Sequence, residues 1–71
     1  MTAAQMITYI RAAEASVKAS QARADLPPGS SRAKVTSANA RWASMAEERE
    51  RLAVGLPVDF TEAVALHLET R

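Results

Sequence analysis

The sequence predicts an all-α protein: an antiparallel two-helix hairpin followed by a short C-terminal helix, which self-association would complete as a helical bundle. Sixteen of the 71 residues are alanine, the strongest helix former, and only three are aromatic. Proline and glycine gather in two short segments, LPPG and GLP, which divide the chain into three stretches. In the first two stretches, apolar residues recur at alternating three- and four-residue steps, the spacing of one helix face.

We therefore expect one small domain over residues 1–71, near the lower size limit for a single core. An isolated hairpin of this size would be marginal, so a third segment or a second copy should help to close the core. The predicted elements are a helix over 2–25, a turn over 26–30, a helix over 31–54, a loop over 55–59 and a short helix over 60–70.

The first helix should begin at Thr2, because Thr2 and Gln5 have the spacing of a capping box. Nothing interrupts the helical pattern until Leu26, where two prolines follow. Ile7 and Tyr9 lie outside the apolar stripe. That stripe consists of Ala3, Met6, Ile10, Ala13, Val17, Ser20 and Ala24.

The second helix should be capped by Ser30 or Ser31 and should end at Gly55, which suits the left-handed position after a helix. Leu56 would supply the apolar contact that often follows such a glycine, and Pro57 prevents the helix from continuing. The seam expected on this helix consists of Val35, Ala38, Trp42, Met45, Arg49 and Leu52. Arg49 breaks its apolar run and should mark the edge of the seam or extend toward solvent.

The short turn makes the two helices antiparallel neighbours, so residues whose numbers add up to about 56 should face each other. Trp42 then lies opposite Ala13, Ala15 and Val17, which places the largest side chain against small ones. The predicted core is Met6, Ile10, Ala13, Val17, Val35, Trp42, Met45 and Leu52.

The last stretch allows two interpretations. Asp59 and Glu62 could form a second capping pair, and a helix over 60–70 would direct Phe60, Val64 and Leu68 toward the hairpin. The same residues together with Leu66 also fit the two-residue alternation of a strand. We prefer the helix, which leaves Leu66 on another side.

The sequence offers few groups for catalysis or metal binding. It has no cysteine and no glycine-rich phosphate loop, and its single histidine, His67, has no positioned nucleophile nearby in the sequence. Glu47, Glu48 and Glu50 could be taken as metal ligands, but the chain lacks the Glu-x-x-His motif of di-metal helical bundles. Glu47 and Arg51 have the i,i+4 spacing of an ordinary helical ion pair. We expect no catalytic residue, no cofactor and no metal site.

Charge is distributed unevenly: residues 30–46 contain three bases and no acid, whereas residues 47–71 contain three bases and six acids. Arg32 and Lys34 would lie at the positively polarised start of the second helix, where cations are disfavoured. They could simply aid solubility, or they could bind an anionic partner. In an antiparallel dimer of the second helices, Lys34 and Arg41 would instead approach the acids of the other copy. The candidate partner-binding residues are Arg32, Lys34, Asn39, Arg41 and Arg49.

The sequence therefore predicts a small non-enzymatic helical module for protein–protein interaction, an assembly subunit, adaptor or inhibitor that forms a homo-oligomer. The alternative is a small nucleic-acid-binding accessory protein that uses the basic start of the second helix. No apolar stretch approaches the length of about 18 residues that crosses a bilayer, and no signal peptide is recognisable, so we expect a cytoplasmic protein without a membrane partner. The composition is common among small proteins of GC-rich bacteria and their phages.

Overall fold

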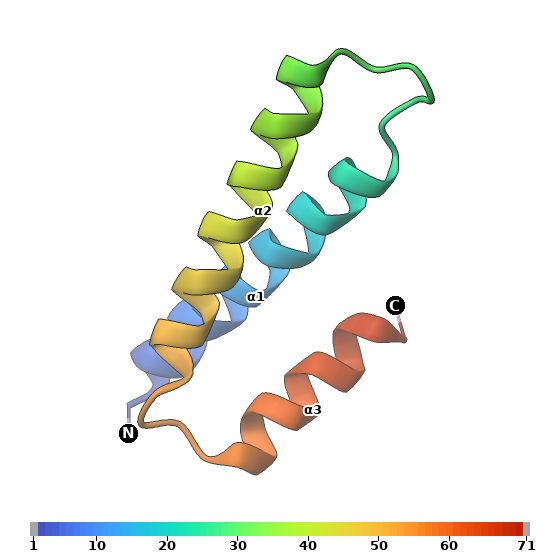
Figure 1. The fold of residues 1–71 in the computed structure, drawn as a ribbon. Coiled ribbons are helices and arrows are strands. Elements are labelled where there is room, and N and C mark those ends of the chain that lie inside the picture. The colour runs from blue at the N-terminus through green and yellow to red at the C-terminus, as the bar shows by residue number, and fades with distance from the viewer. Residues whose placement is uncertain (1, 71) are drawn as a thin grey trace.

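The computed structural model describes residues 2–70, and over these residues it consists of three α-helices without strands: α1 (Ala3–Ala24), α2 (Arg32–Ala53) and α3 (Val58–Glu69). Helices α1 and α2 form the antiparallel hairpin, and α3 packs on α1 (Figure 1). The predicted all-α class, the hairpin and the short C-terminal helix are confirmed, and the strand alternative for the last stretch is wrong. Met1 and Arg71 of the predicted domain lie outside the described residues.

Local sequence signals fix the start of α1 and the turn that follows it. The Thr2 hydroxyl accepts a hydrogen bond from the Gln5 amide at 3.3 Å, and the Gln5 side chain accepts one from the Thr2 amide at 2.8 Å, which is the predicted capping box. In the turn, Gly29 has a φ of +86°, and the Ser30 hydroxyl donates to the carbonyl of Pro27 at 2.6 Å. Ser31 then caps α2 by accepting from the Lys34 amide at 3.3 Å.

The connection between α2 and α3 is partly as expected. Gly55 has a φ of +90°, and Leu56 packs against the core, as the GLP segment predicts. The predicted capping pair of Asp59 and Glu62 is wrong, because α3 already begins at Val58, with Pro57 in the capping position and no side-chain cap. Asp59 instead lies inside the first turn of α3, where its negative charge interacts favourably with the helix dipole.

Tyr9 is the centre of the core, although the sequence pattern placed it outside the apolar stripe. Its side chain is 1% exposed, and it clusters with Ala13 and Leu68. Tyr9 lines a hollow with α2 residues and also meets the ring of Phe60 in α3, at 5.8 Å between ring centroids. The error has a physical cause: α1 is covered on two sides, so its buried surface is wider than one stripe and also includes Ser16 and Ala19.

The predicted core residues differ in their burial. Ala13 is fully buried. Six others are half-buried: Met6, Ile10, Val17, Trp42, Met45 and Leu52. Val35 contradicts the prediction, because it is 39% exposed. It lies near the turn, where the last residues of α1, 21–24, are themselves exposed and supply no large apolar side chain to cover it.

Helix α3 follows the direction of α1 and covers only part of it. Phe60, early in α3, contacts Tyr9, whereas Leu68, near its end, lines a hollow with Val17 and Gln21 of α1. Phe60, Val64 and Leu68 face the core as predicted, and Leu66 is 63% exposed on another side. The hairpin therefore continues beyond the end of α3, as Figure 1 shows.

Because Tyr9 joins both packing surfaces, Tyr9→Ala should lower the free energy of unfolding by about 3 kcal/mol, the typical cost of removing a buried aromatic side chain. Urea denaturation followed by circular dichroism measures this loss. Ile7→Ala is the matched control, since Ile7 is 50% exposed two residues away, and it should cost less than about 1 kcal/mol. Equal losses in the two variants would contradict the central place of Tyr9.

Candidate interaction surface

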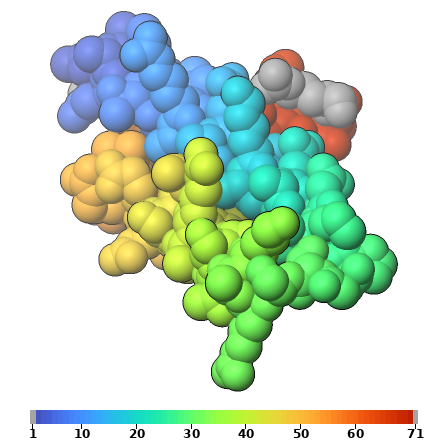
Figure 2. Space-filling model, turned by 90° about the horizontal axis from the view of Figure 1, so that it is seen from above, coloured from blue at the N-terminus to red at the C-terminus, as the bar shows by residue number. Residues whose placement is uncertain are grey.

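The end of the hairpin beyond α3 carries an open hollow between the two helices. Seven residues line it: Ala22 and Leu26 from the α1 side, and Ala33, Lys34, Ser37, Ala38 and Arg41 from α2. We call this set the turn hollow. Figure 2, which views the molecule from the turn end, shows the start of α2 in green on the near side of α1 and α3 in red beyond it.

The turn hollow combines an apolar floor with two cations. Leu26 and Ala38 are half-buried, whereas Lys34 and Arg41 are exposed. Lys34 and Arg41 are seven residues apart, so they lie on the same side of α2 and about 10.5 Å apart along its axis. Within residues 2–70 neither side chain forms an ion pair. The arrangement suits a ligand that has an apolar group between two negative charges.

The other predicted partner-binding residues do not join this surface. Arg32 and Asn39 are exposed, but they are seven residues apart on a different side of α2, since two residues correspond to about 200° around a helix. Arg49 is half-buried and lines a separate hollow with Tyr9 and Ala53, so it belongs to the side that faces α1. The five residues thus do not form one patch, because Arg49 lies on the side of α2 that faces α1.

A contact that the sequence pattern did not reveal links the two helices near this end. The guanidinium of Arg23 in α1 lies 4.8 Å from the centroid of the Trp42 ring in α2, which is a cation–π contact. Trp42 is half-buried rather than fully enclosed. Arg23 lies in the last turn of α1 but outside the predicted apolar stripe, so the sequence pattern gave no signal for this contact.

One of the acids in the second half of α2, Glu48, forms an ion pair within its own helix. Arg51 donates to both carboxylate oxygens of Glu48, at 3.0 Å from Nε and 2.5 Å from Nη2. This pair replaces the predicted pairing of Arg51 with Glu47. The hydrogen bond from Arg51 lowers the pKa of the Glu48 carboxyl, and the same bond raises the pKa of the Arg51 guanidinium.

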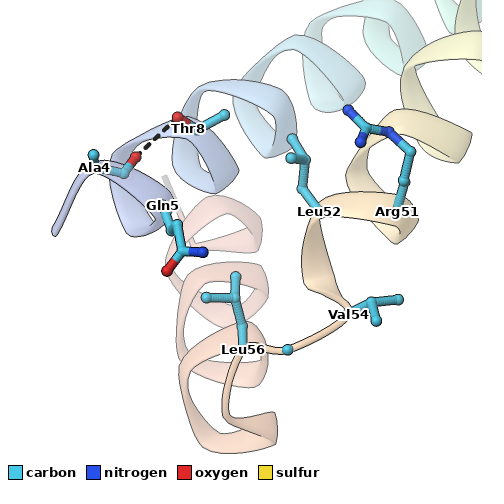
Figure 3. A pocket seen from close by; sticks show the side chains of 8 residues that line it. Ala4, Gln5, Thr8, Arg51, Leu52, Val54 and Leu56 are labelled. Carbon is cyan, nitrogen blue, oxygen red and sulfur yellow. Dashed lines mark hydrogen bonds between the residues drawn. The ribbon is translucent and has the colours of Figure 1, made fainter. Parts of the chain in front are cut away.

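Another hollow lies at the opposite end of the hairpin, beside the loop to α3 (Figure 3). Leu52 and Leu56 line it together with Gln5 and Thr8. The side chains of Gln5 and Thr8 already form hydrogen bonds within the chain: Gln5 caps α1, and the Thr8 hydroxyl donates to the Ala4 carbonyl at 2.8 Å. This hollow therefore offers fewer unpaired groups to a ligand than the turn hollow does.

Other chemistry has little support from the described part of the chain. His67 is exposed in the last turn of α3, and among residues 2–70 no group of three or more histidines and acids is placed to hold a metal ion. None of the helices in that range has the length and apolar character that crossing a membrane requires. No known protein-family model, curated protein or solved structure matches the chain.

The Arg23–Trp42 contact should stabilise the hairpin. We expect Arg23→Gln to lower the free energy of unfolding by about 0.5–1 kcal/mol, the range for a cation–π pair at an accessible site. Urea denaturation followed by the fluorescence of Trp42, the single tryptophan, measures the change. Arg11→Gln, which alters an exposed cation of the same helix, should leave the unfolding midpoint unchanged; a similar loss in both variants would assign the effect to charge alone.

The Glu48–Arg51 pair gives a test that depends on pH. Because the folded-state pKa of Glu48 is lowered, the pair persists above the usual glutamate pKa and is lost as the pH falls through the lowered value. Arg51→Gln should move the Glu48 pKa upward, toward its ordinary value, in a titration of side-chain carboxyl carbons by NMR. An unchanged Glu48 pKa in this variant would show that Arg51 does not hold the carboxylate in solution.

Proposed function

We propose that this chain is a small non-enzymatic helical module that works by protein–protein contact, as an assembly subunit, adaptor or inhibitor, and that it self-associates. The observation that carries the proposal is the uncovered turn end of the hairpin. None of the 22 residues of α2 is buried, and the part of α2 beyond α3 exposes an apolar floor between Lys34 and Arg41. A surface of this kind fits an acidic protein surface with an apolar side chain.

Protein contact is favoured over nucleic-acid binding by the placement of the cations. A phosphate backbone is bound by several cations spread over one face. Here Arg32 lies on a different side of α2 from Lys34 and Arg41, and the hollow between the latter two contains Ala38 and Ser37 but no further cation. The cytoplasmic location expected from the sequence belongs to the same proposal.

The antiparallel pairing of two α2 helices remains one form that self-association could take. Lys34 and Arg41 would then approach Glu47 and Glu50 of the other copy. Glu48 is less suited to this role, because Arg51 of its own chain already holds its carboxylate.

A photoreactive amino acid in place of Ser37 tests the proposal, since Ser37 lines the turn hollow. We expect cross-links to protein, either to a second copy or to a partner in extract, that an excess of unlabelled protein abolishes. The same group in place of Arg11, which is exposed elsewhere on α1, is the control and should give no such product.

Random duplex DNA provides the opposing measurement. We expect no binding at low salt by fluorescence anisotropy. Binding that weakens steeply as salt rises, without protein cross-links at position 37, would replace the proposal with a nucleic-acid function.

A further inference from the structure

The outward face of helix α3 complements the turn hollow in charge, because it carries two acids where the hollow carries two cations. Leu66 is 63% exposed on the side of α3 opposite the core-facing residues. Glu62 lies about one helical turn before Leu66 and Glu69 about one turn after it, and both are exposed. This set of Glu62, Leu66 and Glu69, which we call the α3 outer face, places an apolar side chain between two negative charges.

The spacing of charges is the same on the two surfaces. Glu62 and Glu69 are seven residues apart, as are Lys34 and Arg41, so each pair spans about 10.5 Å along its helix. Within the described residues none of these four side chains forms an ion pair. Between the two acids lies Leu66, and between the two cations lies the floor that Leu26 and Ala38 help to form.

The two surfaces cannot meet within one chain. Leu68, near the end of α3, lies beside Val17 and Gln21, whereas the turn hollow begins at Ala22 and extends away from α3. Leu66 also lies on the side of α3 that faces away from α1, because Phe60, Val64 and Leu68 occupy the packed side. Contact between the α3 outer face and a turn hollow therefore requires two copies.

We propose that the partner in the turn hollow is a second copy of this chain, which docks its α3 outer face there, with Leu66 on the apolar floor and Glu62 and Glu69 beside Lys34 and Arg41. The inference rests on the proposed function and names its partner. Each copy carries one hollow and one α3 outer face, and in the dimer that we propose a two-fold axis forms this contact twice. Opposite charges at both ends of the contact set its register.

Charge reversal tests this dimer. Sedimentation and light scattering of the purified chain should give twice the 7.6 kDa monomer mass. The variant Lys34→Glu/Arg41→Glu and the variant Glu62→Lys/Glu69→Lys should each associate at least roughly 10-fold more weakly, since like charges replace opposite ones. A mixture of the two variants should recover association, because the altered hollow of one matches the altered α3 of the other. Circular dichroism should show unchanged helix content in each.

Two control variants carry the same changes in net charge at other exposed sites. Arg11→Glu/Arg32→Glu should leave the dimer intact, because neither residue lines the turn hollow. Glu47→Lys/Glu50→Lys should also leave it intact. If this second control abolishes the dimer while Glu62→Lys/Glu69→Lys preserves it, two α2 helices form the contact and the inference is wrong.

Leu66→Ser adds a test that does not depend on charge. Because Leu66 is exposed within one copy, the substitution should weaken association without lowering helix content. Unchanged association in this variant, or no recovery in the mixture of charge variants, would overturn the inference. A wild-type chain that stays monomeric at about millimolar concentration would overturn it too, together with the self-association in the proposed function, whereas the protein–protein contact would still stand if cross-links from position 37 reached another protein.

Discussion

The packing of Tyr9 against both neighbouring helices is the contact on which the rest of the structure depends. A chain of this size has room for one small core, and here the core is built around a single aromatic ring, Ala13 and Leu68. The ring of Phe60 fixes the start of α3 beside Tyr9, and α3 ends where Leu68 lies beside Val17 and Gln21 of α1. Everything beyond that point on the hairpin is consequently left open, including the turn hollow.

Features set by neighbouring residues could be predicted from the sequence, whereas those set by the position of α3 could not. The cap formed by Thr2 and Gln5 and the left-handed Gly55 follow from residues a few positions apart. The burial of Tyr9 and the exposure of Val35 depend on which part of α1 the third helix covers, and a stripe on one helix holds no information about that. The mistaken start of α3 has a local cause, because Pro57 can begin a helix without a side-chain cap.

The candidate surface was predicted in part for the same reason. Charge segregation pointed to the start of α2, and Lys34 and Arg41 do lie together there. Helical geometry separates Arg32 and Asn39 from them, and Arg49 is half-buried on the side that faces α1, so the predicted set divides into three groups. The contribution of Ala22 and Leu26 to the apolar floor was not predicted, because Ala22 lies in the other helix and Leu26 in the turn.

The absence of any buried residue in α2 has a consequence for how this protein can change over evolutionary time. Substitutions in a densely packed helix are constrained by volume, whereas most positions of α2 meet solvent on one side and can vary with little effect on folding. The same three-helix frame could thus acquire a different binding preference through a few replacements in α2, while α1 preserves the fold.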